Sequence, residues 1–281
     1  MYIHPRQALR RQRPKVRILS GAPNKSDTYR SFAALGPLDL NIAQGRLTAI
    51  LGHNGSGKST LLKALAGQER PDGGRIDFMG RPIGTWSGRE LARRLAWLPQ
   101  SPALAPGMTL RGLVALGRFP WHGLLGRRSA RDREACDEAL ALTGTTALAD
   151  RLVDTLSGGE RQRGWIAMLL AQGAEVLLLD EPVSALDIAH QVEVMELLAN
   201  LNRRRGLSVI MVLHDLNLAM AWCDEAIALR GGRLAAHCPI ADLHDPALLH
   251  RLYGLEMETV TWRGSRLVIP SRLLGPRAAA E

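Results

Sequence analysis

The sequence predicts an α/β fold with a mostly parallel sheet, and two observations support this prediction. Three apolar stretches of strand length are each followed by a helical pattern, at residues 47–51 and 58–66, 176–179 and 188–205, and 207–213 and 216–223. Strands of a parallel sheet are apolar throughout because crossover helices bury both faces. The second observation is a glycine-rich turn between the first strand and its helix, which is typical of α/β proteins that bind phosphate groups.

The N-terminal half adds shorter strands to this pattern. Alternating apolar residues at 38–42 predict a half-buried strand, which a turn connects to the strand at 47–51. Two further short strands are expected, at 75–79 after a Pro-Asp-Gly-Gly turn and at 95–98 before Pro99. The strands therefore come in two groups, separated along the chain by the first helix.

Residues 101–155 have a different character. Helical spacing is found at 110–117 and 130–142, with a loop rich in Gly, Pro and Trp between them. Apolar strand patterns return only at 176–180, and the last expected strand is at 226–229. We therefore expect a helical insertion within the α/β domain.

The composition indicates a folded chain with basic ends. The chain has 281 residues, 46% of them apolar, and a formal charge of +9. Residues 1–30 carry +7 and residues 263–281 carry +3, which leaves −1 for residues 31–262. A domain that binds nucleic acid is expected to carry its basic residues on folded structure. This distribution of charge instead indicates that the two ends are solvated, or that they are attracted to an anionic membrane surface.

Other classes are excluded by what the sequence lacks. No apolar run reaches the 18 residues of a membrane-spanning helix. The Arg-rich stretch at residues 10–13 is not followed by the apolar core and cleavage site of a signal peptide, so we expect an unprocessed intracellular protein. Cys136, Cys223 and Cys238 are odd in number and lack metal-ligand spacing, which argues against disulfides and a cysteine metal site.

The turn after residue 51 fits the phosphate-binding pattern G-x-x-x-x-G-K-[ST]. Its glycines allow successive backbone N–H groups to point inward at an anion, and the helix that follows adds the positive end of its dipole. Lys58 is expected to bridge the β- and γ-phosphates, and the Ser59 hydroxyl to bind Mg²⁺. The expected nucleotide-binding residues are Gly52, His53, Asn54, Gly55, Ser56, Gly57, Lys58, Ser59 and Thr60.

An acidic pair follows the apolar strand at 176–179. Alone, an apolar strand followed by two acidic residues indicates only a core strand that runs into a turn. A phosphate loop, however, needs a carboxylate near its metal ion. Asp180 is expected to hold Mg²⁺, and Glu181 to act as the general base that polarises the attacking water.

A third motif, Leu156-Ser157-Gly158-Gly159-Glu160, opens the next helical pattern. By itself it is an N-cap and a turn, with the positive end of a helix dipole. Together with the phosphate loop and the acidic pair, however, the sequence resembles the ATP-binding subunits of ABC transporters, whose signature motif is LSGGQ, here with Glu160 in place of Gln. The resemblance implies a head-to-tail homodimer in which Ser157, Gly158, Gly159 and Glu160 complete the ATP site of the opposing subunit.

The same resemblance implies roles for four further residues. Gln100 matches the glutamine that reaches Mg²⁺ and water and links the site to the membrane partner. His214 matches the switch histidine that contacts the γ-phosphate. Asp187 matches the aspartate of the Ser-Ala-Leu-Asp loop, although Val183 stands where Thr is usual. Tyr29 lies 23 residues before Gly52, where the family has an aromatic residue that stacks on adenine.

The resemblance also implies domain boundaries. Residues 26–262 are expected to form the ABC ATPase core, with an N-terminal antiparallel β subdomain and an inserted helical subdomain at about 101–172. Residues 1–25 and 263–281 are expected to be a basic N-terminal segment and a basic C-terminal tail outside the domain.

Three stretches of the sequence indicate a particular group within this family. His53, residues 117–127 and residues 184–191 resemble the ATPase of iron(III)-hydroxamate siderophore importers. This implies an ATPase at the inner face of the cell membrane that drives import, with polytopic permease subunits and, indirectly, a periplasmic or surface siderophore-binding protein. ATPases for haem, vitamin B12, ferric citrate and catecholate siderophores share most of the other motifs. DNA-associated ABC ATPases and a non-transport regulator are more remote alternatives, and we expect no nucleic-acid partner.

Overall fold

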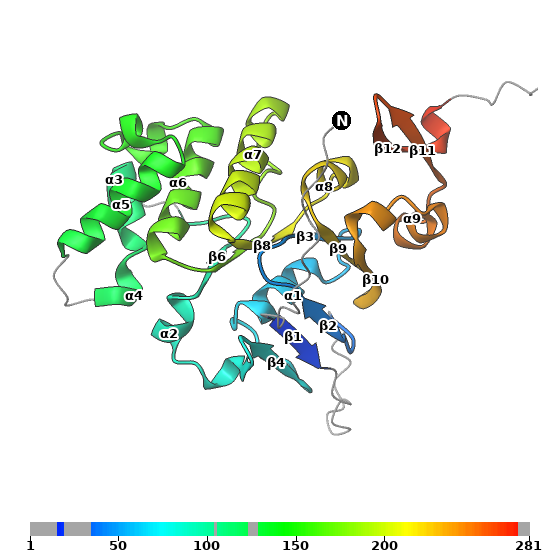
Figure 1. Cartoon of the computed structure of the whole chain (residues 1–281), viewed down its shortest axis with the longest axis horizontal. Helices are drawn as coiled ribbons and strands as arrows, with labels where there is room; N and C mark the ends of the chain where they lie inside the picture. The colour runs from blue at the N-terminus through cyan, green and yellow to red at the C-terminus, as the bar shows by residue number, and fades with distance from the viewer. Residues whose placement is uncertain (1–15, 20–34, 104–105, 123–128, 275–281) are drawn as a thin grey trace, which may run out of the picture.

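A six-stranded sheet runs through the middle of the molecule, with strand order β10-β9-β3-β8-β7-β6 (Figure 1). All neighbours are parallel except β10, which is antiparallel to β9. The strands are β3 (Leu47–Leu51), β6 (Leu95–Leu98), β7 (Val176–Leu179), β8 (Ser208–Val212), β9 (Glu225–Arg230) and β10 (Arg233–Pro239). The predicted mostly parallel sheet is therefore confirmed. The computed structural model describes residues 16–19, 35–103, 106–122 and 129–274, with the backbone alone at 16–19.

The two faces of this sheet are covered by different layers. On β7, Val176 and Leu178 pack with α1 and the N-terminal strands, whereas Leu177 and Leu179 pack in the core formed with the other helices. The alternation follows from the two-residue period of a strand. The helices at the sheet are α1 (Lys58–Leu65), α7 (Ile188–Arg205), α8 (Leu216–Trp222) and α9 (Pro246–Tyr253).

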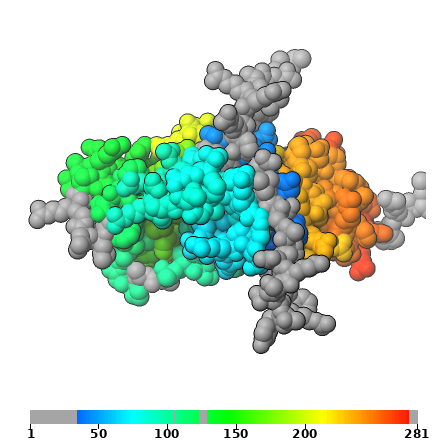
Figure 2. Space-filling view, turned by 90° about the horizontal axis from the view of Figure 1, so that it is seen from below, coloured from blue at the N-terminus to red at the C-terminus, as the bar shows by residue number. Residues whose placement is uncertain are grey.

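The expected helical insertion forms an arm at one end of the molecule, opposite α9 (Figures 1 and 2). Gly117 allows α3 and α6 to approach closely, because a Cβ at Gly117 would lie 2.1 Å from the Met168 carbonyl oxygen. The helices of the arm are α3 (Leu110–Leu116), α4 (Phe119–His122), α5 (Ala130–Leu142) and α6 (Gly158–Gln172), and the short α2 (Gly88–Ala92) precedes them.

A second, antiparallel sheet has the strand order β2-β1-β4-β5. Its strands are β1 (Val16–Leu19), β2 (Leu40–Ile42), β4 (Arg75–Phe78) and β5 (Arg81–Pro82). We expected residues 1–25 to lie outside the domain, but β1 pairs with β2 on one side and with β4 on the other. The reason is that the four-residue pattern of β1 is embedded in a strongly basic segment, which hid it. The domain therefore begins at β1 or earlier.

This position of β1 leads to a prediction about truncation. Deleting residues 1–20 removes a central strand and leaves the edges of β2 and β4 unpaired, so we expect a loss of at least about 3 kcal/mol in the free energy of unfolding. For a chain of this size that corresponds to a melting temperature lower by about 10 °C. The matched control is deletion of residues 1–14, which leaves β1 intact and should melt like the full chain. Equal melting temperatures of the two truncated chains would contradict the prediction.

The C-terminal region contains a hairpin of β11 (Met257–Trp262) and β12 (Ser265–Pro270). Asn217 on α8 fixes the hairpin: its Nδ2 donates to the Val268 carbonyl at 3.0 Å, and its Oδ1 accepts from the Val268 N–H at 2.8 Å. We expected the tail to begin at residue 263, but strand pairing continues to Pro270. No helix in the described part of the chain is long and apolar enough to cross a membrane.

Candidate functional site

The residues expected to act on the nucleotide follow the carboxyl ends of four parallel strands. The phosphate loop follows β3, Gln100 follows β6, Asp180 and Glu181 follow β7, and His214 follows β8. Leu98 is in register with Leu179 on the neighbouring strand, so these loops leave the sheet at one edge. Ligands of open α/β sheets bind at this edge.

The phosphate loop has a shape that only glycine permits at its first position. Gly52 has a φ of 144°, and a Cβ there would lie 2.2 Å from the Leu229 carbonyl oxygen. Gly57 has a φ of 95° and forms the N-cap of α1. The buried Ser56 hydroxyl lacks a hydrogen-bond partner among the described residues. His53 and Asn54 are exposed, and Thr60 is half-buried on α1. The loop thus has the curvature expected of an anion site.

Lys58 is folded into the loop. Its Nζ donates to the carbonyl oxygens of Gly52 at 2.9 Å and of His53 at 3.0 Å. Burial lowers the pKa of the Lys58 ammonium, and the negative charges of Glu181 and Asp180 oppose that shift. The ammonium is thus held within the curve of the phosphate loop.

Ser59 and Asp180, two of the residues expected at the Mg²⁺ site, contact each other. The Ser59 hydroxyl donates to Asp180 Oδ1 at 3.1 Å, although the two residues are 121 positions apart. Burial raises the pKa of the Asp180 carboxyl, the hydrogen bond from Ser59 opposes this shift, and the charge of Glu181 adds to it. A hydroxyl and a carboxylate are the hard oxygen donors that Mg²⁺ prefers, so this pair fits that ion chemically.

Glu181 is held between two other predicted residues. Gln100 Nε2 donates to Glu181 Oε2 at 2.8 Å, and His214 Nε2 lies 2.6 Å from Glu181 Oε1. The backbone of Glu181 has a φ of 53°, in the left-handed region that is uncommon for residues other than glycine. This strained conformation belongs to the residue whose carboxylate the other two side chains contact, and strain of this kind is concentrated at functional sites.

The signature residues lie apart from this group, at the start of α6 in the helical arm (Figure 1). The Ser157 hydroxyl accepts from the Glu160 N–H at 3.3 Å, and Glu160 Oε2 accepts from the Ser157 N–H at 2.9 Å. The hydrogen bond from the Ser157 N–H holds the pKa of Glu160 below its usual value. Glu160 therefore completes a capping box, which is a physical reason for Glu at this position. Gly158 is exposed and Gly159 is buried.

Asp187 is the N-cap of α7 and accepts from the His190 N–H at 2.9 Å. Sequence reasoning assigned no separate role to His190, whose Nδ1 also contacts the Asp187 carboxylate. The Asp-x-x-His spacing before a helical pattern is the signal that would have identified this contact. Tyr29, the expected adenine-stacking residue, lies outside the described residues.

A parallel α/β sheet with a phosphate loop and acidic residues at its carboxyl edge defines the class of nucleotide-hydrolysing phosphate-loop proteins. Residues 35–184 match the family model described as ABC transporter. This chain belongs to the ABC transporter family. It binds ATP, and it is an ATPase that couples hydrolysis to transport.

Known relatives match most of the chain. The achromobactin transport ATP-binding protein of Dickeya dadantii (strain 3937) is 44% identical over 83% of this chain and 86% of its own length. The iron(3+)-hydroxamate import ATP-binding protein of Bacillus subtilis (strain 168) is 41% identical over 80% and 83%, respectively. The hemin import ATP-binding protein of Thermobifida fusca (strain YX) is 38% identical over 94% of both chains.

A solved structure is also similar. It is an inward-facing conformation of a putative metal-chelate type ABC transporter, with a TM-score of 0.77, 25% sequence identity, and coverage of 92% of this chain and 97% of that chain.

Proposed function

We propose that this chain is the ATP-hydrolysing subunit of an importer for iron(III)–siderophore complexes of the hydroxamate type. The assignment of ATP hydrolysis to particular residues rests on one observation. Glu181 contacts both Gln100 and His214, next to the Ser59–Asp180 pair. The import assignment rests on relatives that handle iron chelates and match most of the chain.

Catalysis would combine charge stabilisation with proton transfer. Lys58 and the N–H groups of the phosphate loop stabilise negative charge on the phosphate oxygens. Glu181 accepts a proton from the attacking water, and Gln100 and His214 orient its carboxylate. Ser59, Asp180 and Gln100 would hold Mg²⁺, which would supply positive charge to offset the negative charge of the phosphates.

A second copy of the chain would complete each site. Within one chain, the Ser157 hydroxyl and the Glu160 carboxylate each accept a hydrogen bond from the backbone N–H of the other residue. In a head-to-tail dimer, Ser157 and the exposed start of α6 face the ATP that the other subunit holds on its phosphate loop, and Asp187 lies in the same interface.

The helical arm would contact a polytopic permease at the inner face of the cell membrane. Leu116, Phe119 and Trp121 lie on α3 and α4, and their exposed fractions are 46%, 47% and 41%. Exposed apolar side chains mark a protein-binding surface where they gather into a patch, so we expect these three residues to lie at the permease contact. A siderophore-binding protein would act on the permease and not on this chain.

The hydroxamate assignment is narrower than the import assignment. It rests on His53 and on the sequence of residues 117–127 and 184–191. Part of residues 117–127 serves the fold, because Arg118 is buried and donates to Asp132 at 2.8 Å. Relatives named for achromobactin and hemin share 44% and 38% identity with the chain. Haem, vitamin B12 and other metal chelates are therefore the alternative cargoes.

Uptake by cells whose only copy carries Lys58→Ala tests this function. We expect uptake of an iron(III)-hydroxamate to fall at least about 10-fold, because loss of the ammonium weakens nucleotide binding and charge stabilisation. Iron(III)-catecholate and hemin uptake should be unchanged. The matched control is Lys63→Ala on the same helix, whose side chain is 42% exposed. Normal hydroxamate uptake together with lost hemin or catecholate uptake would overturn the cargo assignment.

A further inference from the structure

Two segments that the proposed function places at the subunit interface are packed on each other within one chain. One is the start of α6, with Gly158 and Gly159, and the other is the loop that ends at Asp187 together with the first turn of α7. Leu186 Cδ2 lies 3.4 Å from the position that a Cβ would take at Gly158. The corresponding position at Gly159 lies only 2.2 Å from His190 Cδ2 and 3.0 Å from His190 Nε2.

The absence of a side chain at Gly159 has a spatial reason. Gly159 is buried within α6 and does not have the positive φ for which glycine is usually required. Glycine is unfavourable inside a helix, by about 1 kcal/mol relative to Ala. The His190 ring fills the space that a Cβ would need, so glycine at 159 is matched to histidine at 190.

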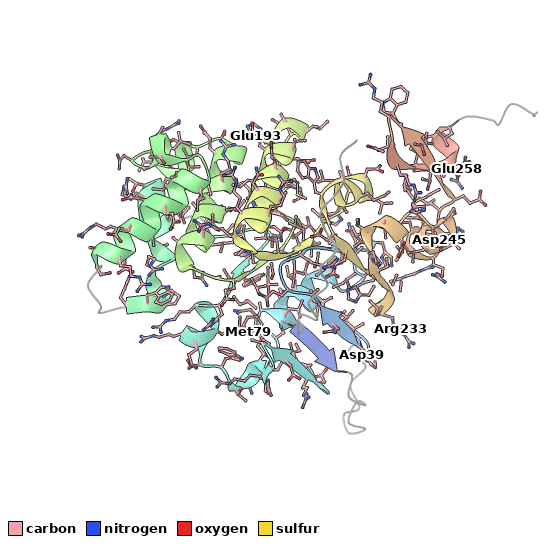
Figure 3. The ribbon with its side chains drawn as sticks, in the orientation of Figure 1. Asp39, Met79, Glu193, Arg233, Asp245 and Glu258 are labelled. Atoms are coloured by element: carbon pink, nitrogen blue, oxygen red, sulfur yellow. The ribbon has the colours of Figure 1, made fainter. Side chains whose placement is uncertain are left out.

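His190 is itself fixed by Asp187. The Asp187 carboxylate accepts from the His190 N–H at 2.9 Å, and its two oxygens lie 2.8 and 2.9 Å from His190 Nδ1. With its Nδ1 side turned to Asp187 and its Cδ2 edge turned to Gly159, the imidazole is a spacer of defined length. One turn further along α7, Glu193 on the side facing the arm forms an ion pair with Arg163 of α6 (Figure 3).

We propose that His190 is a positioning residue that sets the spacing between Asp187 and Gly159, so that both segments meet the second copy of the chain as one rigid unit. This inference rests on the proposed ATPase function and deepens it. Ser157 and Gly159 serve the ATP held by the other subunit, so His190 acts on the partner's site. The ATP site of the subunit that contains His190, with Lys58, Ser59 and Asp180, does not depend on the contact between His190 and Gly159.

Steady-state kinetics of the assembled transporter separate positioning from general structure. We expect His190→Ala to lower kcat for ATP hydrolysis about 10-fold, since a displacement of 1 Å can cost up to 100-fold in rate. ATP affinity of the isolated subunit and its melting temperature should stay close to those of the unmodified chain. The variant His190→Asn keeps an amide donor for Asp187 but lacks the ring edge at Gly159, so the loss of kcat should persist in a chain that folds. The matched control is His250→Ala, at an exposed position on α9.

Two results would overturn the proposal. An unchanged kcat in His190→Ala and His190→Asn would exclude a positioning role. Weaker ATP binding by the isolated subunit, or a large fall in melting temperature, would show that His190 supports the fold as a whole. Failure of the proposed function is distinguishable, because iron(III)-hydroxamate uptake would then not respond to Lys58→Ala, whereas ATP hydrolysis by the unmodified transporter would still report the effect of His190→Ala.

Mixed dimers test whether His190 acts on the partner's site. In a dimer of one Glu181→Gln chain and one His190→Ala chain, the intact Glu181 is opposed by an intact signature turn, so one site is fully normal. We expect the ATPase rate to match that of a mixed dimer of Glu181→Gln with the unmodified chain. A rate about 10-fold lower would place the effect in the site of the same subunit and overturn this assignment.

The contact with Gly159 has its own test in a double-mutant cycle. Gly159→Ala alone places a Cβ against the His190 ring and should lower the melting temperature. In the His190→Ala background the space is free, so the same substitution should have less than half of that effect. Additive effects of the two substitutions would show that the side chains at 159 and 190 do not compete for the same space, and would contradict the role of His190 as a spacer.

Discussion

Replacing Glu181 by Gln is expected to lower ATP turnover at least about 100-fold, since a positioned general base contributes 10²- to 10⁴-fold. In the unmodified chain the Glu181 carboxylate oxygens lie 2.8 Å from Gln100 Nε2 and 2.6 Å from His214 Nε2, and an amide of nearly the same shape can remain in contact with both side chains. It cannot accept the proton of the attacking water. The variant should therefore bind ATP normally and trap the nucleotide unhydrolysed.

Phosphate release at saturating ATP, together with the affinity for a fluorescent ATP analogue, measures the two properties separately. Glu69→Gln is the matched control, since that carboxylate is a solvent-accessible partner of Lys63 at 3.6 Å. Hydrolysis by Glu181→Gln at the rate of the unmodified chain would refute the role of Glu181 as the general base.

Gly52→Ala is expected to have the second large effect, on both stability and nucleotide binding. The new Cβ would lie 2.2 Å from the Leu229 carbonyl oxygen and 2.7 Å from Ser56 Oγ, and the carbonyl is fixed in β9. Relief requires movement of the strand or the loop, so we expect a loss of about 3 kcal/mol or more in the free energy of unfolding. The displaced loop should bind ATP at least about 100-fold more weakly, as a rearranged phosphate site loses several charge-assisted hydrogen bonds.

Gly55→Ala is the control in the same loop. Gly55 has a φ of 78°, but a Cβ there meets no atom within 4 Å, so the substitution adds strain without a clash. The expected cost is about 1 kcal/mol. Thermal melting and nucleotide titration compare the two variants, and equal effects would contradict the importance of the close contact at Gly52.

Much of the architecture could be predicted from the sequence because the parallel strands are continuous apolar runs. The strands 47–51, 176–179 and 95–98 were predicted at the residues where β3, β7 and β6 lie. β1 was missed, since a strand of four residues in a basic segment is recognised only by its pairing with β2 and β4. The β11–β12 hairpin was missed although each of its strands has six residues, because most of their side chains are half-buried or exposed and give no apolar strand pattern.

The candidate site was predictable in part. Strand ends placed Gln100, Glu181 and His214 at one edge of the sheet, but the left-handed backbone of Glu181, whose carboxylate the other two side chains contact, could not be predicted. That conformation has no signal in a sequence pattern, because it is imposed by the packing around it. The spatial match of Gly159 and His190 likewise joins residues 31 positions apart on different helices.

The place of β3 in the central sheet has a consequence for synthesis on the ribosome. β3 carries the phosphate loop, and its two neighbours are β8 and β9, which pair with it through residues 209–212 and 225–228. At 5–20 residues per second, the nascent chain needs about 10–35 s after β3 has been made to produce both partners. The strand that carries the phosphate loop therefore cannot pair with its neighbours early in translation. We expect this apolar strand to be exposed to chaperones during that interval.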